Sequence, residues 1–196
     1  MQSIEFTIKG TRPVLFSKEP IAFEERPAKG NGRKSKDETP QEQAAKCLHT
    51  IENGKGPVAV IPSHSILKGL QAVTTIALGR STRKSYVKLV KGAVQIEPAN
   101  LVISPQDWTL DVRRAGSPMK GSGTGALLYR PRFDLWEVKG SVIYDDEHLS
   151  AEQIRALFDT AGKFNGVGSY RIGNGGPMGS YMVNSWVDEE DRKSVV

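Results

Sequence analysis

The spacing of apolar residues changes in a fixed order along this chain, and that order constrains the fold more than any single motif does. Residues 3–10 alternate apolar and polar side chains, which is the period-two pattern of a half-buried strand. Residues 63–77 and 149–164 instead repeat apolar positions every three or four residues, as a helix with one buried face does. Further strands are predicted at residues 58–61, 91–103, 130–144 and 179–187.

The order of these elements predicts an α+β fold. Strand, helix and strand are followed by a second strand, helix and strand, which is the split βαβ pattern of a ferredoxin-like (RRM-like) core. Its antiparallel sheet would carry two helices on one face, and its open face would be a common platform for single-stranded nucleic acid. Two large insertions, about residues 17–57 and 104–132, interrupt a single domain predicted at residues 1–187, with a charged tail at 188–196. The second insertion should be a hairpin on an extended base.

Several element boundaries carry their own signals. The predicted helix caps are Thr39 with Pro40 after it, Ser63 or Ser65, and Ser150 with Gln153 completing a capping box. The helix that begins at Pro40 should run on toward Gly54. The apolar phase slips near Gly140, which predicts a bulge or bend within the strand at 130–144.

Basic residues are concentrated in the middle of the chain. The net charge is +5, and residues 68–132 hold eleven Lys or Arg against three acids. Residues 145–196 hold nine acids and five bases. This asymmetry is the electrostatic footprint expected for a polyanion such as nucleic acid. A solvated basic surface, or a basic face that docks an acidic protein, would carry the same charge.

The composition excludes several classes of protein. No apolar run approaches the ~20 residues of a membrane span, and the N-terminus lacks the apolar core of a secretory signal. The single cysteine, Cys47, excludes an internal disulfide and a cysteine-rich zinc site. His49, His64 and His148 have no metal-ligand spacing with one another or with Cys47. A cytoplasmic protein without a metal or cofactor is therefore expected.

Residues 162–183 contain seven glycines and separate the last predicted helix from the last strand. Their order excludes a dinucleotide-binding fingerprint, because no strand precedes the stretch and no helix follows it. Such a loop can offer backbone N–H groups to phosphates, while Tyr170 stacks on a base and Arg171 pairs with a phosphate. Gly168 and Gly176 should need positive φ or close approach of another strand, so valine at Gly168 should lose binding with at most a modest loss of stability. The alternative is a flexible connector.

Two segments together resemble the RAMP superfamily, the repeat-associated proteins that build CRISPR effector complexes. The backbone subunits of that family carry an "IPGSSLKG"-like turn and helix, and a glycine-rich loop before the last strand. Here residues 61–69 read "IPSHSILKG", with His64 where a glycine is more usual. The matching residues are Ile61, Pro62, Ser63, Ser65, Leu67, Lys68 and Gly69 in the first segment, and Gly166, Gly168, Arg171, Gly175, Gly176 and Gly179 in the second.

The resemblance implies a CRISPR backbone subunit that assembles in multiple copies along a strand, beside other effector-complex subunits. It also implies that the insertion at 104–132 is thumb-like and enters a guide–target duplex. The strand "RPRFDLWEV" at residues 130–138 and the glycine loop are equally similar to those of small phage-encoded proteins, which would bind single strands on their own. RNA and DNA both stay open, because a contact to a 2′-hydroxyl is a matter of geometry.

We predict a single-stranded nucleic-acid binding protein that is not an enzyme. The alternative is a metal-independent endoribonuclease, since RAMP processing ribonucleases use a histidine such as His64 to activate a 2′-hydroxyl. Tyr129 is a second candidate for base stacking. The predicted binding residues are Ser63, Ser65, Lys68, Arg80, Arg83, Lys84, Arg113, Arg114, Arg130, Arg132, Gly166, Gly168, Tyr170 and Arg171.

Overall fold

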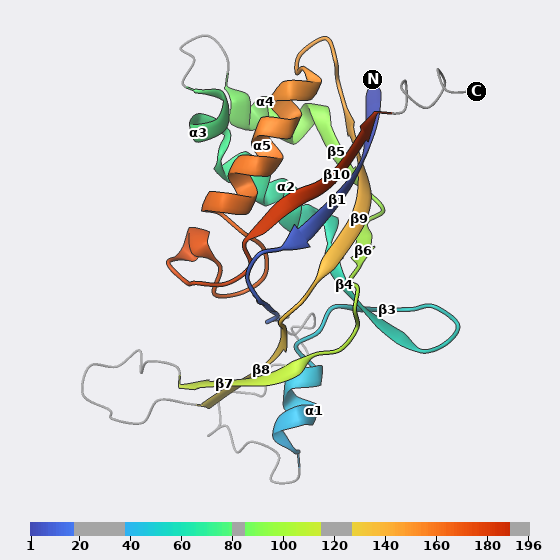
Figure 1. Ribbon diagram of the computed structural model, residues 1–196, viewed down its shortest axis with the longest axis vertical. Coiled ribbons are helices and arrows are strands. Elements are labelled where there is room, and N and C mark those ends of the chain that lie inside the picture. The colour runs from blue at the N-terminus through green and yellow to red at the C-terminus, as the bar shows by residue number, and fades with distance from the viewer. Residues whose placement is uncertain (18–37, 80–84, 115–126, 189–196) are drawn as a thin grey trace, which may run out of the picture.

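The structure, a computed structural model, describes residues 1–17, 38–79, 85–114 and 127–188 (Figure 1). Its core is a four-stranded sheet in the order β10-β1-β9-β5, and every neighbouring pair of strands is antiparallel. These strands are β1 (Gln2–Gly10), β5 (Val94–Glu97), β9 (Glu137–Tyr144) and β10 (Tyr181–Asp188). The register of β1 against β10 shifts between Thr7 and Ile8.

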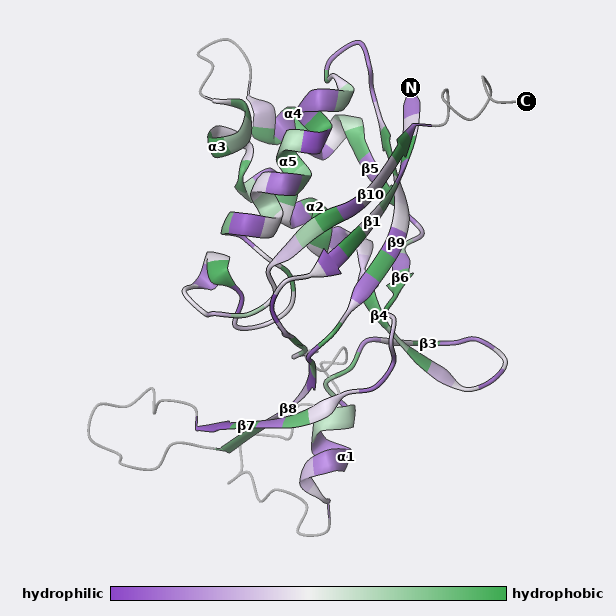
Figure 2. Ribbon diagram, viewed as in Figure 1, coloured by the Kyte–Doolittle hydropathy of each residue, from purple (hydrophilic) through white to green (hydrophobic). Residues whose placement is uncertain are grey.

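Helices cover one face of this sheet (Figure 1). They are α2 (Ser63–Ala72), α3 (Thr74–Leu78), α4 (Tyr86–Ala93) and α5 (Ala151–Phe164). Phe158 of α5 joins the two layers, because its ring centroid lies 4.8 Å from that of Phe6 in β1 and 5.3 Å from that of Trp186 in β10. Figure 2 shows the alternation of hydrophobic and hydrophilic residues along β9 that lets one side of the strand enter this core.

Two smaller antiparallel sheets adjoin the core sheet, one of them through β6 beside β9 (Figure 1). Their strand orders are β3-β4-β6 and β2-β8-β7. The strands are β2 (Val14–Leu15), β3 (Thr50–Glu52), β4 (Pro57–Pro62), β6 (Asn100–Val102), β7 (Thr109–Arg114) and β8 (Leu127–Phe133). The helix α1 (Pro40–Ala45) packs against β8. The chain is therefore a mixed α and β protein with several antiparallel sheets and, in the described residues, five α-helices.

Several local predictions are confirmed. β1 and β10 form where the sequence alternates, and β7 and β8 pair as a hairpin base within the second insertion. At the start of α5, the N–H of Gln153 donates to Oγ of Ser150 at 3.3 Å, and the N–H of Ser150 donates to Oε1 of Gln153 at 3.0 Å. Thr39 caps α1 in the same reciprocal way with Glu42. No described helix combines the length and apolarity needed to cross a membrane.

The helix predicted at residues 63–77 is wrong in its extent. It breaks at Val73 into α2 and α3, and Ile76 is left 62% exposed. The hydroxyl of Thr74 donates to the carbonyl oxygen of Gln71 at 3.1 Å, and such a side-chain bond competes with the helical ladder. The run of β-branched residues at 73–76 lowers helix propensity at the same point.

The cap predicted for this helix is also wrong. Pro62 occupies the N-cap position, and neither Ser63 nor Ser65 makes a side-chain cap. The reason is that α2 begins directly where β4 ends. The N–H of Ser63 instead donates to the carbonyl oxygen of Ala99 at 2.9 Å.

Two predicted segments change element. The helix from Pro40 ends at Ala45, and residues 50–52 form β3 instead because β4 pairs with them. The predicted strand at 91–103 begins only at Val94, after α4, and divides into β5 and β6 in different sheets.

The strand predicted at 130–144 breaks at residues 134–136 into β8 and β9, not near Gly140. Gly140 keeps its register against β1. A Cβ there would lie 2.6 Å from Cδ2 of Leu101 and 2.7 Å from the carbonyl oxygen of Glu97, so this glycine permits close packing and makes no bulge.

Candidate nucleic-acid interface

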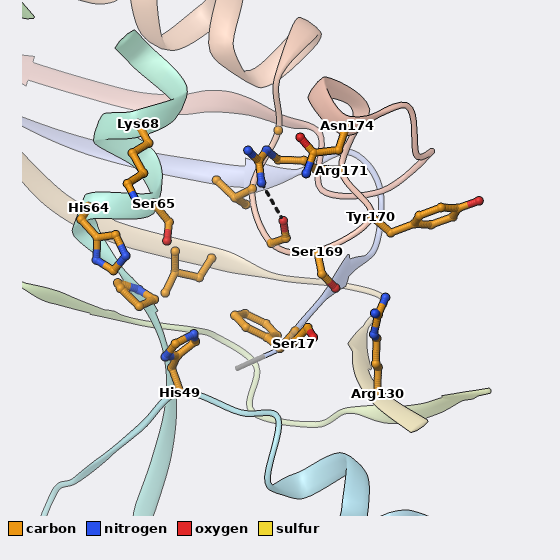
Figure 3. A pocket seen from close by; sticks show the side chains of 16 residues that line it. Ser17, His49, His64, Ser65, Lys68, Arg130, Ser169, Tyr170, Arg171 and Asn174 are labelled. Atoms are coloured by element: carbon orange, nitrogen blue, oxygen red, sulfur yellow. Dashed lines mark hydrogen bonds between the residues drawn. The ribbon is translucent and has the colours of Figure 1, made fainter. Parts of the chain in front are cut away.

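A cavity of about 630 Å³ opens between the glycine-rich loop at residues 165–180, the start of α2, the residues that follow β2 and the middle of β8 (Figure 3). Segments far apart in the sequence contribute to it. Its lining residues are Phe16, Ser17, His49, Ile61, Pro62, His64, Ser65, Lys68, Arg130, Gly166, Val167, Gly168, Ser169, Tyr170, Arg171 and Asn174. The two segments that carry the RAMP resemblance therefore face the same space.

The glycine-rich loop is a hydrogen-bonded structure that includes the 3₁₀ helix η2 (Ile172–Asn174). The N–H of Val167 donates to the carbonyl oxygen of Gly179 at 2.9 Å, and that of Met178 donates to Tyr170 at 3.2 Å. The loop is also tied to β2, because the N–H of Ser169 donates to the carbonyl oxygen of Leu15 at 2.8 Å. These bonds do not fit the alternative of a flexible connector.

The two glycines singled out in the sequence meet the predicted constraints. Gly168 has φ of 77°, and a Cβ there would lie 2.5 Å from the carbonyl oxygen of Leu15. Gly176 has no positive φ, but a Cβ there would overlap the carbonyl oxygen of Tyr170. Both positions need a residue without a side chain, for different reasons.

Between residues 166 and 172 of the loop, three backbone N–H groups make no hydrogen bond to another described residue. They are the N–H groups of Gly168, Tyr170 and Arg171, whereas the other loop amides mostly bond to loop or strand carbonyls. All three residues line the cavity. The guanidinium of Arg171 donates through Nη1 to the carbonyl oxygen of Gly168 at 3.4 Å, and its buried Nε meets no acceptor among the described residues. Such donors suit an anion with several oxygens.

The lining is positively charged. Lys68, Arg130 and Arg171 contribute three cations, and among the described residues the lining holds no Asp or Glu. His49 and His64 lie on one side of the cavity in Figure 3, with Arg171 across from them. His64 is exposed at the start of α2, while His49 is half-buried with its ring edge-on to Phe16 at 6.4 Å. This charge pattern favours a polyanionic ligand.

The predicted binding residues divide into three groups. Ser65, Lys68, Arg130, Gly166, Gly168, Tyr170 and Arg171 line the cavity, and His64 does too. Ser63, Arg113, Arg114 and Arg132 do not line it. Arg80, Arg83 and Lys84, and the hairpin tip at 115–126, lie outside the described residues.

Two of the arginines outside the cavity have acidic partners. Arg132 pairs with Asp134 at 2.5 Å. Arg113 donates through Nε and Nη2 to the two carboxylate oxygens of Asp111 at 2.7 and 3.1 Å, and these hydrogen bonds raise the pKa of Arg113. Arg113 therefore carries a neutralised charge, unlike the free phosphate-binding cation expected from the sequence.

Sequence reasoning missed Phe16, Ser17, His49, Ser169 and Asn174. His49 was placed on a helix that in fact ends four residues earlier. Its backbone carbonyl accepts from the N–H of Val60 at 2.9 Å, so the pairing with β4 carries it to the cavity. No local sequence pattern predicts that residues 49–52 pair with β4.

The open face of the core sheet does not match the expected platform. A hollow on this face is lined by Glu5, Glu97 and Lys139, and its one aromatic lining residue, Phe6, is buried. Of its described residues, two are acids and one is a base, and none offers an exposed aromatic ring for stacking. The candidate interface therefore lies at the cavity and not on the sheet.

The acidic turn before α5 is explained by its own hydrogen bonds. Asp145 accepts from the N–H of Glu147 at 3.1 Å and lies 2.8 Å from Nδ1 of His148. These three side chains are close enough to share a metal ion. Exposed acidic turns commonly have this geometry without a metal, and nothing else at this position points to a ligand.

Comparison with known proteins assigns this chain to no family. No protein-family model and no curated protein matches the sequence. One solved structure that resembles the fold is a chain described as "CRISPR RNA-guided surveillance complex", with 12% identity and a TM-score of 0.37. The match covers 81% of this chain and 58% of that chain, so this chain spans less than two thirds of its length. A TM-score this low does not establish a shared fold.

Proposed function

We propose that this chain binds single-stranded RNA or DNA and seats phosphates of the strand in the cavity between the glycine-rich loop and α2. One observation carries the proposal. In the part of the chain that the structure describes, the lining has three cationic side chains, three loop residues whose backbone N–H groups make no hydrogen bond, and no carboxylate. Phosphate oxygens are bound in this way by guanidinium, ammonium and clustered backbone amides. Such contacts bind the backbone of a strand without reading its sequence.

A ferredoxin-like, RAMP-type domain at residues 1–187 is part of the proposal. The order β10-β1-β9-β5, with α2 between β1 and β5 and α5 between β9 and β10, supports it. The two RAMP-like segments also pack closely, since a Cβ at Gly69 would lie 3.0 Å from Nδ2 of Asn165. Such a protein would assemble side by side along a strand, as a CRISPR effector subunit or a stand-alone phage protein. Mass measurements on strands of increasing length test the multiple copies.

Direct binding measurements test the main proposal. Labelled single-stranded RNA, single-stranded DNA and duplex are titrated with the parent, Lys68→Ala and Arg171→Ala. Each substitution should weaken single-strand binding about tenfold, since a hydrogen bond to a charged group contributes roughly 1.5 kcal/mol. Lys139→Ala is the matched control. Lys139 is an exposed cation on the open face of the core sheet and does not line the cavity. Equal losses in all three variants, or no binding by the parent, would contradict the proposal.

A second candidate is a metal-independent endoribonuclease, because His49 joins His64 in the same cavity. One imidazole would take the proton of a 2′-hydroxyl while the 2′-oxygen bonds to phosphorus. The bond from phosphorus to the 5′-oxygen would break, and the second imidazole would return a proton to that oxygen. Cleavage of RNA in the presence of EDTA, lost in His64→Ala and in 2′-deoxy substrate, would support this function. A shift in the electrophoretic mobility of the RNA without cleavage would support binding alone.

A further inference from the structure

Tyr170 has an unusual backbone conformation for its residue type. Its φ is 54°, and in the described part of the chain it is the one residue other than glycine with a positive φ. Left-handed backbone is unfavourable for a bulky side chain and persists only where surrounding contacts impose it. Here the carbonyl oxygen of Tyr170 accepts from the N–H of Met178 and packs against Gly176. The loop thus holds the ring in one direction.

That direction is outward. Figure 3 shows the Tyr170 side chain leaving the loop at the rim of the cavity, pointing away from the histidines. The residue is 44% exposed. An exposed aromatic ring held by a strained backbone is a costly arrangement for a purely structural residue.

A second element fixes the ring. The guanidinium carbon of Arg113, on β7, lies 4.7 Å from the ring centroid of Tyr170. Arg113 is itself held by the two hydrogen bonds that it donates to Asp111, which is 8% exposed. A planar guanidinium stacks well on one face of an aromatic ring. A series of contacts therefore links the buried carboxylate of Asp111, the guanidinium of Arg113 and the exposed ring of Tyr170.

We propose that Tyr170 is a stacking platform for one nucleobase of the bound strand, and that Asp111 and Arg113 are positioning residues that hold its ring. This inference rests on the proposed function. Arg113 covers one side of the ring, and the exposed remainder receives the base. Because Tyr170 itself lines the cavity, a base on the ring and a phosphate in the cavity belong to the same nucleotide or its neighbour. Stacking of this kind is tolerant of sequence, since every base has a π-face.

The test compares two single strands of equal length and charge, one with bases and one abasic. Tyr170→Asn suits the left-handed backbone, because asparagine tolerates it. This variant should bind the base-bearing strand about 5- to 150-fold more weakly, the range that base–aromatic stacking spans. Its affinity for the abasic strand should equal that of the parent. Tyr170→Phe keeps the ring and should bind both strands as the parent does.

Arg113→Lys tests the positioning role. Lysine keeps the charge but loses the planar fork, so it should weaken binding to the base-bearing strand alone and leave the salt dependence unchanged. Arg155→Lys is the matched control. Arg155 pairs with Asp159 at 3.0 Å and lies 5.3 Å from the ring centroid of Trp186, away from the cavity lining. It should leave binding to both strands unchanged.

The outcomes separate this inference from the proposed function. If the parent binds both strands and Tyr170→Asn changes neither affinity, the stacking platform is wrong and the phosphate site stands. If Arg113→Ala weakens abasic binding and flattens the salt slope by about 0.7, Arg113 is a phosphate contact and not a positioning residue. If the parent binds neither strand, both proposals fail.

Discussion

Gly168 shows how a single position of the loop can be constrained twice. Its φ of 77° disfavours any side chain, and the carbonyl oxygen of Leu15 lies 2.5 Å from where a Cβ would stand. The sequence led us to expect that valine here would lose binding with at most a modest loss of stability. The contact with β2 reverses the second half of that expectation, because the loop is part of the folded core.

Gly168→Val should lower the free energy of unfolding by about 2–4 kcal/mol, combining left-handed strain with overpacking. Gly175→Val is the matched control, because Gly175 has φ of 76° and no atom within 4 Å of its Cβ position. It should lose only about 1–2 kcal/mol from strain. Denaturant unfolding of both variants measures the difference. Equal stability of the two variants would mean that the contact with β2 is loose.

At the scale of elements, α5 positions one end of the glycine-rich loop. Its first turn is closed by Ser150 and Gln153, and its buried side includes Ile154, Leu157 and Phe158. The helix ends at Phe164, immediately before the loop begins. The stability of this helix therefore bears directly on the cavity.

Ser150→Ala should destabilise the protein by about 1 kcal/mol, since it leaves the N–H of Gln153 without its side-chain acceptor. Ser85 provides the control. It occupies the N-cap position of α4 but makes no side-chain cap hydrogen bond, so Ser85→Ala should change stability by only a few tenths of a kcal/mol. Unfolding in urea measures both. A larger loss in Ser85→Ala than in Ser150→Ala would overturn this assignment of the caps.

At the scale of the whole molecule, charge should govern binding. Three cations line the cavity while the hollow on the open face of the sheet holds two acids. If all three cations contact phosphates, the logarithm of the binding constant should fall with the logarithm of salt concentration with a slope of about −2. Lys68→Ala should flatten that slope by about 0.7 and Lys139→Ala should not. An affinity that barely changes with salt would exclude the cavity as the phosphate site.

The sequence predicts the elements whose signals are local. Alternation over residues 3–10 and the capping box at Ser150 correspond to β1 and α5, because strand faces and helix starts depend on nearby residues. The family resemblance singled out Lys68 and the glycine stretch, but that they line one cavity was not predicted. The ferredoxin-like arrangement stays a proposal that the strand order supports.

Only the tertiary structure decides which sheet each strand joins and which side chains meet. Residues 130–144 read as one strand, yet β8 pairs with β7 while β9 pairs with β1 and β5, since hydrogen bonds between distant segments outweigh local pattern. His49 reaches the cavity through β4, and Arg113 reaches Tyr170 across 57 residues of sequence. Arg113 is neutralised locally by Asp111, two residues away on β7. Its contact with the ring of Tyr170 exists only once β7 and the loop are packed together.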